Sequence, residues 1–504
     1  MFSTVFYLTF VAAVTLIFGS RRANKLPYPP GPVPIPILGN VRDFTLKELW
    51  VTAAQWTRTY GDITYLHVLN WNIIFLGTRE VADQLLDKRG ALYSDRPELQ
   101  MTGELCGVEK LIPFSKYNET FKSQRRHIQQ TIGSRVIPSY HPLIQNQTLH
   151  TLKCLINSPE EYTQHFRNFA GGLSLAVVYG YLPKDGNDKF LLMGSECLSI
   201  LANEVTSGGG IWAVDVFPFL KLLPSWFPGC GFKKKAEKWK VKMKEFVEAP
   251  FALAKMRTLN GTILPSFCSK LLNSDEINER TEDIIKHTAN SMFAASADTF
   301  ILAMLQYPDV MEKAQEEIDR IVGTGRLPDF PDRESLPYVE AVLSEVWRWG
   351  APGPLNLPHC STEDNIYNGM FIPKGTIAIA NIWSMLRDES LFPNPDVFDP
   401  ERYLNVNPEL KSKRDPRNVL FGFGRRRCPG ADLADSSNWM LLVSMLATLN
   451  IYKASDDKGE PTDPKATYNN CFFRVPDQLA IDIKPRSRQA LELVEAELSN
   501  FEPV

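Results

Sequence analysis

Residues 421–430 read FGFGRRRCPG and directly precede an apolar segment, 433–449, that predicts a buried helix. Gly424 and Gly430 permit tight turns and the close approach of a flat ligand to the backbone. Three consecutive arginines and the start of the following helix favour a thiolate at Cys428. A single sulfur ligand suits haem iron, whereas an arginine-rich surface loop with a free thiol explains the same residues equally well.

The spacing within this loop resembles the haem-binding signature of the cytochrome P450 superfamily, in the residues Phe421, Gly424, Arg426, Cys428 and Gly430. The resemblance runs from the N-terminal segment to about Ser487 and is strongest to the fungal microsomal members. It implies haem b as the cofactor and Cys428 as the axial ligand of its iron. It also implies that Arg426 pairs with a haem propionate and that Phe421 packs on the sulfur side of the haem.

The globular part reads as mainly α with a small β region, the composition of the cytochrome P450 fold. β-Branched and aromatic residues over 63–76 predict a hairpin, and helix-period segments dominate from about 121 to 349. Short strands are expected over 354–379, and a final hairpin over 472–483. No break in composition follows residue 40, so we expect residues 41–504 to form a single haem-thiolate catalytic domain.

The N-terminus predicts a membrane anchor. Residues 1–19 are apolar and uncharged, and a basic and proline-rich linker follows over 20–40. Because the basic cluster follows the apolar run, an uncleaved signal-anchor is favoured over a cleaved signal peptide. By the positive-inside rule, the expected location is the endoplasmic reticulum membrane, with a single pass and the catalytic domain facing the cytoplasm.

Glu345 and Arg348 lie three residues apart in a helical stretch, so both side chains share one face. Taken alone, such a pair is commonly a solvated ion pair of little energetic value. Downstream, the segment at 400–403 is similar to a family motif that contains Arg402. The resemblance implies that Glu345, Arg348 and Arg402 form a buried charge network that locks the haem-binding core.

Asp298 and Thr299 lie within a long apolar segment, where a buried carboxylate is expensive. A helix bend or a polar contact to a neighbour would account for them. They resemble the family's oxygen-activation motif, which implies that they are catalytic and help to deliver protons. Phe300 follows directly, whereas about two further helical turns usually intervene in related sequences. This shortened segment predicts either an artefact of the gene sequence or an impaired protein.

Further positions are assigned by resemblance. Arg125 and His359 match positions that contact haem propionates, although a lone histidine is more often structural. An apolar substrate pocket is implied at Leu105, Val108, Leu111, Ala294, Leu355, Leu357 and Phe472. Six cations near the cysteine loop predict a docking surface for an acidic flavoprotein, namely Lys411, Lys413, Arg414, Arg417, Arg425 and Arg427.

Composition excludes several other classes. The chain has 504 residues, 44% of them hydrophobic, and a net charge of -3, which does not suit a nucleic-acid partner. None of its eight cysteines forms the close pair that structural zinc sites favour. No metal ligand other than Cys428 is therefore expected.

The function implied is a haem-thiolate monooxygenase that inserts one oxygen atom from O2 into a small apolar substrate. That substrate is expected to be a secondary-metabolite intermediate or a xenobiotic, such as a polycyclic aromatic or a terpenoid. NADPH–cytochrome P450 reductase is the expected electron donor, with cytochrome b5 and the lipid bilayer as further partners. Two alternatives stay open: a haem-binding protein without turnover, and a membrane-tethered thiol protein without haem.

Overall fold

The structure is a computed structural model that describes residues 26–44, 47–183, 188–206, 212–273, 278–290, 298–454, 462, 466–468 and 473–500. Its α-helices are α2 (Leu49–Tyr60), α3 (Arg79–Ala82), α4 (Gly90–Tyr93), α5 (Glu119–Ile132), α6 (His141–Asn157), α7 (Tyr162–Tyr179), α8 (Lys189–Ser199), α9 (Ala213–Val216), α10 (Phe232–Leu259), α11 (Phe267–Leu272), α12 (Glu279–Asn290), α13 (Asp298–Gln306), α14 (Pro308–Ile321), α15 (Pro337–Gly350), α16 (Ile382–Met385), α17 (Pro408–Arg414), α18 (Arg417–Leu420), α19 (Ala431–Thr448) and α20 (Arg488–Asn500). Its strands are β1 (Ile63–Val68), β2 (Trp71–Leu76), β3 (His359–Cys360), β4 (Asn365–Tyr367), β5 (Met370–Ile372), β6 (Ile377–Ala380), β7 (Leu449–Lys453) and β8 (Ile481–Pro485). The predicted mainly α fold with a small β region is confirmed.

Local sequence signals set several helix ends. The Asn118 side chain caps α5 by accepting a hydrogen bond of 2.9 Å from the Phe121 N–H. Pro308 opens α14, where its missing N–H leaves no helical bond unmade. At the other end of a helix, Gly180 terminates α7 in the left-handed conformation, with φ of 60°.

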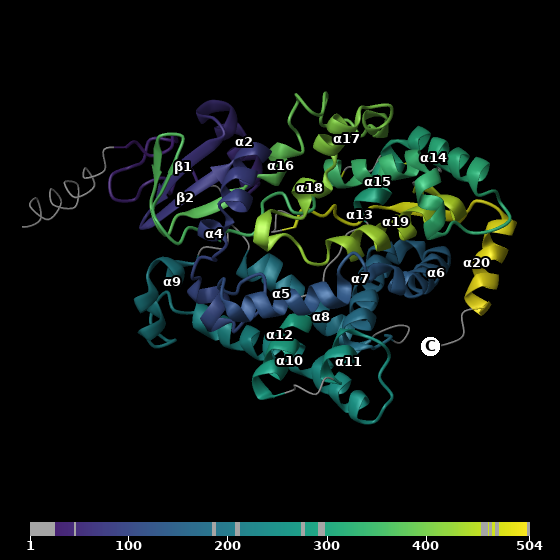
Figure 1. Cartoon of the computed structure of the whole chain (residues 1–504), viewed down its shortest axis with the longest axis horizontal. Coiled ribbons are helices and arrows are strands. Elements are labelled where there is room, and N and C mark those ends of the chain that lie inside the picture. The colour runs from purple at the N-terminus through teal and green to yellow at the C-terminus, as the bar shows by residue number, and fades with distance from the viewer. Residues whose placement is uncertain are drawn as a thin grey trace, which may run out of the picture.

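A four-stranded sheet forms one end of the molecule, in the order β1-β2-β6-β3 (Figure 1). The predicted hairpin over 63–76 is confirmed, because β1 and β2 pair antiparallel with Ile63 opposite Leu76. β6 adds in parallel to β2, so residues far apart in sequence meet at Ile73 and Ile377. α2 covers this sheet and helps to bury Phe75.

The largest core lies between the helices. It is built mainly from α6, α7, α13, α15 and α19, and Trp439 is its largest fully buried side chain. The loop that joins α18 to α19 lies near the middle of the molecule, between α15 and α5 (Figure 1). This loop contains Cys428, the predicted metal ligand.

The predicted final hairpin over 472–483 is wrong. β8 begins at Ile481 and pairs antiparallel with β7, with Ile451 opposite Ile483. The partner strand therefore comes from the end of α19, a long-range pairing that local hydrophobic alternation does not encode.

The predicted anchor, residues 1–19, and the first residues of the linker lie outside the described residues. In the part of the chain that the structure describes, no helix is both long and apolar enough to cross a bilayer. The prediction of a single-pass protein of the endoplasmic reticulum membrane required such a helix. The described residues contain none, so that prediction is not supported.

Candidate haem site

The cysteine loop folds back on itself before α19 begins. The Cys428 N–H donates a hydrogen bond of 2.7 Å to the Phe421 carbonyl, which closes the loop. Gly424 has a φ of 52°, and a Cβ there would lie 2.3 Å from the Leu86 carbonyl oxygen. Only glycine fits at this position without displacing the backbone. The loop thereby places the sulfur one turn before the N-terminus of α19.

The Cys428 side chain is exposed, yet burial raises the pKa of its thiol. Both observations hold when protein atoms surround a thiol that a ligand can still reach. The Gly430 N–H and the charges of Arg125 and Arg427 act against burial and favour the thiolate. A thiol that the protein encloses, and that no side chain covers, suits a ligand that binds there.

Two buried arginines converge beside the loop. Arg426 donates hydrogen bonds to the carbonyls of Ser94 (2.7 Å), Ile112 (3.0 Å) and Ser115 (2.7 Å). Its guanidinium also lies 3.8 Å from the centre of the Phe121 ring. Burial lowers the pKa of Arg426 to about 10. These contacts fix the position of the charge without neutralising it.

Arg96 adds a second buried cation to the site, and His359 lies close to it. Arg96 donates to the carbonyls of Pro113, Leu357 and Pro358 at 2.6–2.8 Å. Burial, followed by the charge of Arg426, lowers its pKa well below the usual value. The pKa of His359 is also well lowered, by burial and then by Arg96, and its Nδ1 lies 2.7 Å from the Tyr93 carbonyl.

The arginines of this site fit the carboxylates of a haem. Within the described ranges, no carboxylate lies within ion-pair distance of Arg96, Arg125 or Arg426. Arg426 lies close enough to Arg96 and to Arg125 for their charges to interact. Buried charges are normally paired, so this group of guanidiniums calls for an anion. A haem carries two propionates and a metal that a lone thiolate can bind. No other group of metal-ligating side chains occurs in the described part of the chain.

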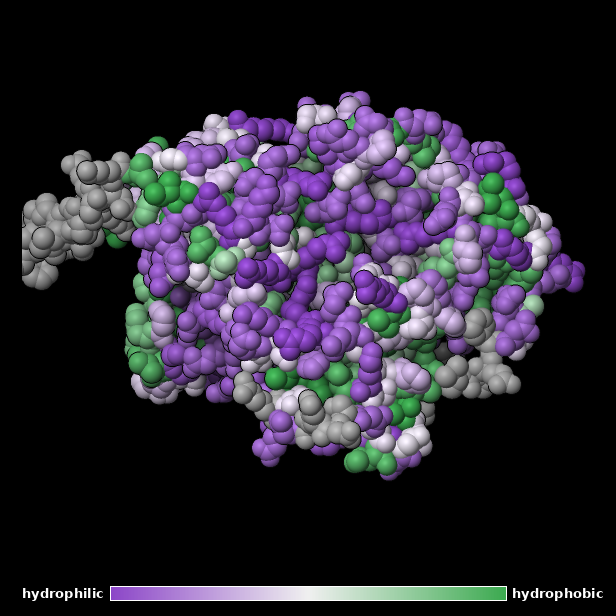
Figure 2. All heavy atoms as spheres, viewed as in Figure 1, coloured by the Kyte–Doolittle hydropathy of each residue, from purple (hydrophilic) through white to green (hydrophobic). Residues whose placement is uncertain are grey.

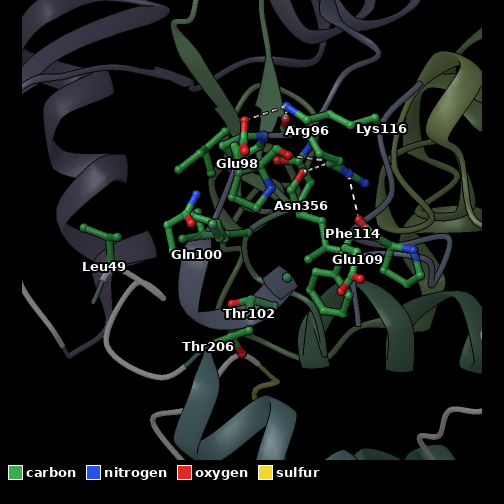
Figure 3. A pocket seen from close by; sticks show the side chains of 18 of the residues that line it. Leu49, Arg96, Glu98, Gln100, Thr102, Glu109, Phe114, Lys116, Thr206 and Asn356 are labelled. Carbon is green, nitrogen blue, oxygen red and sulfur yellow. Dashed lines mark hydrogen bonds and ion pairs between the residues drawn. The ribbon is translucent and has the colours of Figure 1, made fainter. Parts of the chain in front are cut away.

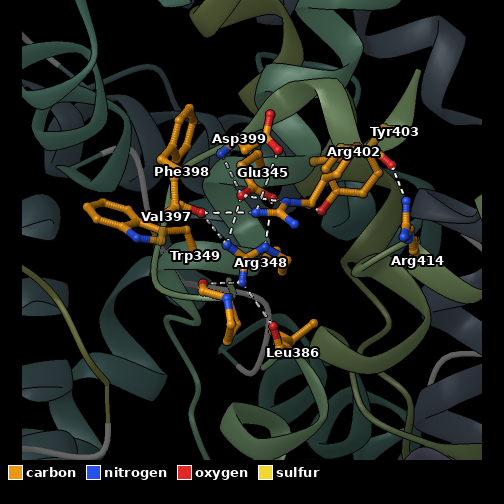
Figure 4. Close-up of polar contacts among 12 residues, drawn as sticks. Glu345, Arg348, Trp349, Leu386, Val397, Phe398, Asp399, Arg402, Tyr403 and Arg414 are labelled. Carbon is orange, nitrogen blue, oxygen red and sulfur yellow. Dashed lines mark hydrogen bonds and ion pairs between the residues drawn. The ribbon is translucent and has the colours of Figure 1, made fainter. Parts of the chain in front are cut away.

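Glu345, Arg348 and Arg402 meet in a buried network (Figure 4). Arg348 donates to both carboxylate oxygens of Glu345, at 2.7 and 2.8 Å, and Arg402 donates to the same carboxylate at 3.1 Å. The side chains of Glu345 and Arg348 are fully buried. The Tyr403 hydroxyl and the Asp399 N–H complete the shell around Glu345. α15 is thereby fixed to the segment that follows Leu386.

Asp298 and Thr299 lie at the start of α13. Their neighbours come from α15 and α7 and not from the cysteine loop. The Thr299 side chain packs on Gly350 at the end of α15, where an added Cβ would lie 2.7 Å from Thr299 Cγ2. Asp298 Oδ1 is buried without a hydrogen-bond partner, and Arg167 is the cation that acts on it. The structure therefore brings neither side chain into contact with Cys428 or Arg426. Residues 291–297, which precede them, lie outside the described residues.

A cavity of about 430 Å³ opens beside Arg96 (Figure 3). Two of the predicted pocket residues, Leu355 and Leu357, line it. Three others do not: Leu105 packs against Trp239, and Val108 and Leu111 pack against Phe246. These three apolar residues belong to small hydrophobic cores between helices and not to the wall of the cavity. Ala294 and Phe472 lie outside the described residues.

Comparisons with known proteins decide the family. The sequence profile described as Cytochrome P450 matches residues 29–474. The chain belongs to the cytochrome P450 family. It is 38% identical over 491 residues to cytochrome P450 monooxygenase claR of Ampulloclitocybe clavipes, covering 95% of this chain and 90% of the relative. It is 36% identical over 491 residues to tryptamine 4-monooxygenase of Psilocybe cyanescens, covering 94% of this chain and 96% of that protein.

As a cytochrome P450 monooxygenase, the protein uses haem b and receives electrons from NADPH through a separate reductase. The face shown in Figure 2 is covered largely by hydrophilic side chains, including the region of the cysteine loop. Four of the six predicted docking cations are exposed, namely Lys411, Lys413, Arg425 and Arg427.

The other two predicted docking cations of the cytochrome P450 are used internally. Arg414 donates to the carbonyls of Leu391 and Arg402, both at 2.7 Å. Arg417 forms ion pairs with Glu340 and, at 2.9 Å, with Asp435. Their charges hold α17 and α18 against the core, so a sequence count of cations overstates the charge that the surface offers.

Arg96 is a buried arginine of the candidate site that sequence reasoning missed. It stands before Pro97, outside every motif, and its importance arises from carbonyls at residues 113, 357 and 358 that only the fold assembles. The one local signal is an arginine directly before a proline. Tyr403 was missed as a partner of Glu345 in the same way, although it adjoins Arg402 in the sequence.

Asp298 of this cytochrome P450 predicts an unusual dependence of stability on pH. Burial raises its pKa from 3.8 to about 6, so the folded state binds this proton more tightly than the unfolded state. Folding stability therefore falls as the pH rises from 3.8 to about 6, and the cost persists above that range. We expect Asp298→Asn to stabilise the protein by up to about 2 kcal/mol at neutral pH, with a smaller gain at about pH 5.

Thermal unfolding monitored by circular dichroism at both pH values measures this effect. Asp283→Asn is the matched control. At Asp283, burial is outweighed by the hydrogen bond from Lys110 and by nearby cations, which lower the pKa. The control should therefore lose stability at neutral pH. A destabilised Asp298→Asn protein would contradict the assignment.

Proposed function

We propose that this cytochrome P450 inserts one oxygen atom from O2 into a small apolar substrate, with Cys428 as the axial ligand of the haem iron. The observation that carries the proposal is the exposed thiol of Cys428 in the same loop as the buried Arg426, which has no carboxylate within ion-pair distance among the described residues. A free thiol in a surface loop would not need this buried cation. The alternative of a thiol protein without haem is therefore disfavoured.

Different side chains of the candidate site would have different roles in binding the haem. Arg96, Arg125, Arg426 and His359 would hold the propionates, and their carbonyl partners keep the donors oriented before the cofactor binds. Phe421 packs edge-on against Trp347, with ring centres 5.5 Å apart, and would shield the sulfur side. When bound, the haem supplies the oxidation chemistry, while the protein supplies orientation and exclusion of water. Residues 41–504 would form this catalytic domain.

Reduced protein treated with carbon monoxide tests the ligand assignment directly. We expect the difference spectrum of a thiolate-ligated haem, together with NADPH consumption and product formation when a reductase is co-expressed. A haem spectrum without thiolate character would overturn the role of Cys428. Adding cytochrome b5 to the same assay tests that further predicted partner.

A haem-binding protein with impaired turnover is the second candidate. One observation favours it: Thr299 packs on Gly350, and Arg167 is the cation whose charge acts on the buried Asp298. Proton delivery by this pair would then be lost. The expected signature is a normal thiolate spectrum with NADPH consumption that yields little product. Sequencing the transcript across Thr299 and Phe300 decides whether the shortened segment belongs to the natural protein.

The cavity beside Arg96 supports the predicted substrate class. Its wall contains apolar residues such as Leu49, Phe114 and Ile379, so a secondary-metabolite intermediate or a polycyclic aromatic or terpenoid xenobiotic would fit. Screening such compounds with the co-expressed reductase identifies the reaction. Conversion of none of them would contradict an apolar substrate.

A further inference from the structure

The cysteine loop is closed at its base by an ion pair. Arg417 begins α18 before the loop, and Asp435 lies in α19 after it. The Arg417 Nε–H donates a hydrogen bond of 2.9 Å to the Asp435 carboxylate. Cys428 lies between these two residues in the sequence. One side-chain contact therefore joins the segment that enters the loop to the segment that leaves it.

This pair belongs to a ring of four charged side chains. Arg333 donates two hydrogen bonds to Asp435, at 2.7 and 3.0 Å, and two to Glu340, at 3.0 and 3.2 Å. Arg417 also donates to Glu340. Each carboxylate thus binds both guanidiniums, and the two positive charges balance the two negative ones. Since Glu340 lies in the first turn of α15, the ring ties both ends of the loop to that helix.

The ring is largely shielded from solvent. Its four side chains are between 20% and 28% exposed. Burial alone would raise the pKa of Asp435, but the hydrogen bond from Arg333 and the charge of Arg417 outweigh it and lower that pKa. The carboxylate is therefore ionised at neutral pH. Removing its charge leaves two half-buried guanidiniums that water solvates poorly.

Aromatic packing connects the ring to the sulfur side of the loop. The Arg417 guanidinium lies 5.1 Å from the centre of the Trp347 ring, which packs edge-on against Phe421. The Phe421 carbonyl accepts the hydrogen bond from the Cys428 N–H. A displacement of Arg417 would therefore disturb the residue that holds the backbone of Cys428.

An ion pair that only stabilises the fold is the plainer explanation, and the protein contains a pair that fits it. Arg486 donates to both oxygens of Asp319, at 2.9 and 2.7 Å, and these side chains are 20% and 37% exposed. Arg486 also donates to the Ala447 carbonyl, near the far end of α19. The two pairs resemble each other in bonding and exposure, but only Arg417 and Asp435 enclose the cysteine loop.

We propose that Arg417 and Asp435 are positioning residues for the haem thiolate: their ion pair holds the cysteine loop closed, so that Cys428 stays where it can ligate iron. Both residues act through the backbone of the loop. The inference rests on the proposed function, because it takes Cys428 to be the axial ligand. Loss of the pair should release the thiolate from the iron before the protein unfolds.

Asp435→Asn tests this inference, since it removes the charge and keeps the shape of the side chain. The reduced holoenzyme is held under carbon monoxide below its unfolding temperature. The thiolate difference spectrum and the helical circular dichroism are followed on the same samples. The thiolate spectrum should be lost about tenfold faster than in the unaltered protein, the effect expected of a charge-assisted hydrogen bond, while the helical signal stays constant. Asp435→Glu keeps the charge and should restore most of the original rate.

Asp319→Asn is the matched control, because it breaks the comparable pair with Arg486. Its unfolding temperature should fall, but its thiolate spectrum should be lost at most about twofold faster. Arg417→Lys provides a second variant in case Asp435→Asn does not fold. A lysine ammonium keeps the charge but lacks the planar fork that binds two carboxylates, so the loss should accelerate about threefold.

Three outcomes would overturn the inference: an unchanged rate of thiolate loss in both Asp435→Asn and Arg417→Lys, equal acceleration in Asp435→Asn and Asp319→Asn, or loss of the thiolate spectrum only together with the helical signal. In each of these cases the unaltered protein still has its thiolate spectrum, and the proposed function stands. Absence of that spectrum from the unaltered holoenzyme would refute the proposed function and this inference with it.

Discussion

Replacing Cys428 with alanine is expected to yield a folded protein that contains no haem and has no monooxygenase activity. Among the described residues, no cluster of three or more metal-ligating side chains offers the iron another site, so loss of the Cys428 thiolate should prevent its binding. The Gly430 N–H and the charges of Arg125 and Arg427 would then surround an empty position. Haem content from the pyridine haemochromogen assay, and turnover with a reductase, should both fall at least about a hundredfold.

Cys360→Ala is the matched control for this experiment. Cys360 is also a free, partly exposed cysteine, but burial raises the pKa of its thiol to about 11 and it lies in strand β3. Its substitution should leave haem content unchanged. Retention of a thiolate spectrum in Cys428→Ala would refute the assignment of the ligand.

Glu345→Gln should destabilise the fold more than any exposed substitution. The change leaves Arg348 and Arg402 buried beside a neutral amide, and Arg348 is fully buried. Breaking a buried pair in this way costs about 3–5 kcal/mol, because the remaining charge has no water to solvate it. We expect a low yield of soluble protein and an early unfolding transition in differential scanning calorimetry.

An exposed pair in the same protein provides the comparison. Glu401 pairs with Lys313 at 3.0 Å, and each side chain is 54% exposed. Glu401→Gln removes the same charge at the surface, where such pairs contribute about 0–1 kcal/mol. Equal effects of the two substitutions would show that burial of Glu345 does not determine the cost.

The sequence was informative wherever a few neighbouring residues carry the structure. The cysteine loop and the pair Glu345 and Arg348 are short patterns in which the spacing already determines which residues meet. In the structure, Arg348 bonds to Glu345, and Cys428 bonds to Phe421 within the loop. The hairpin over 63–76 belongs to the same class, since its two strands are adjacent in sequence.

Features assembled from distant segments could not be predicted. Arg96 binds carbonyls from two other regions, and β8 finds its partner at the end of α19. Val108 and Leu111 show the converse problem, because apolar residues of a small core and of a cavity wall look alike in sequence.

The close packing of Thr299 on Gly350 has an evolutionary consequence. A side chain at position 350 would collide with Thr299 in the shortened protein, since its Cβ would lie 2.7 Å from Thr299 Cγ2. Two more helical turns after Thr299 would change what faces Gly350 and could remove that restriction. The fitness effect of a mutation at 350 would then depend on an insertion far away in the gene. This is epistasis between a length change and a point change, with one steric contact as its cause.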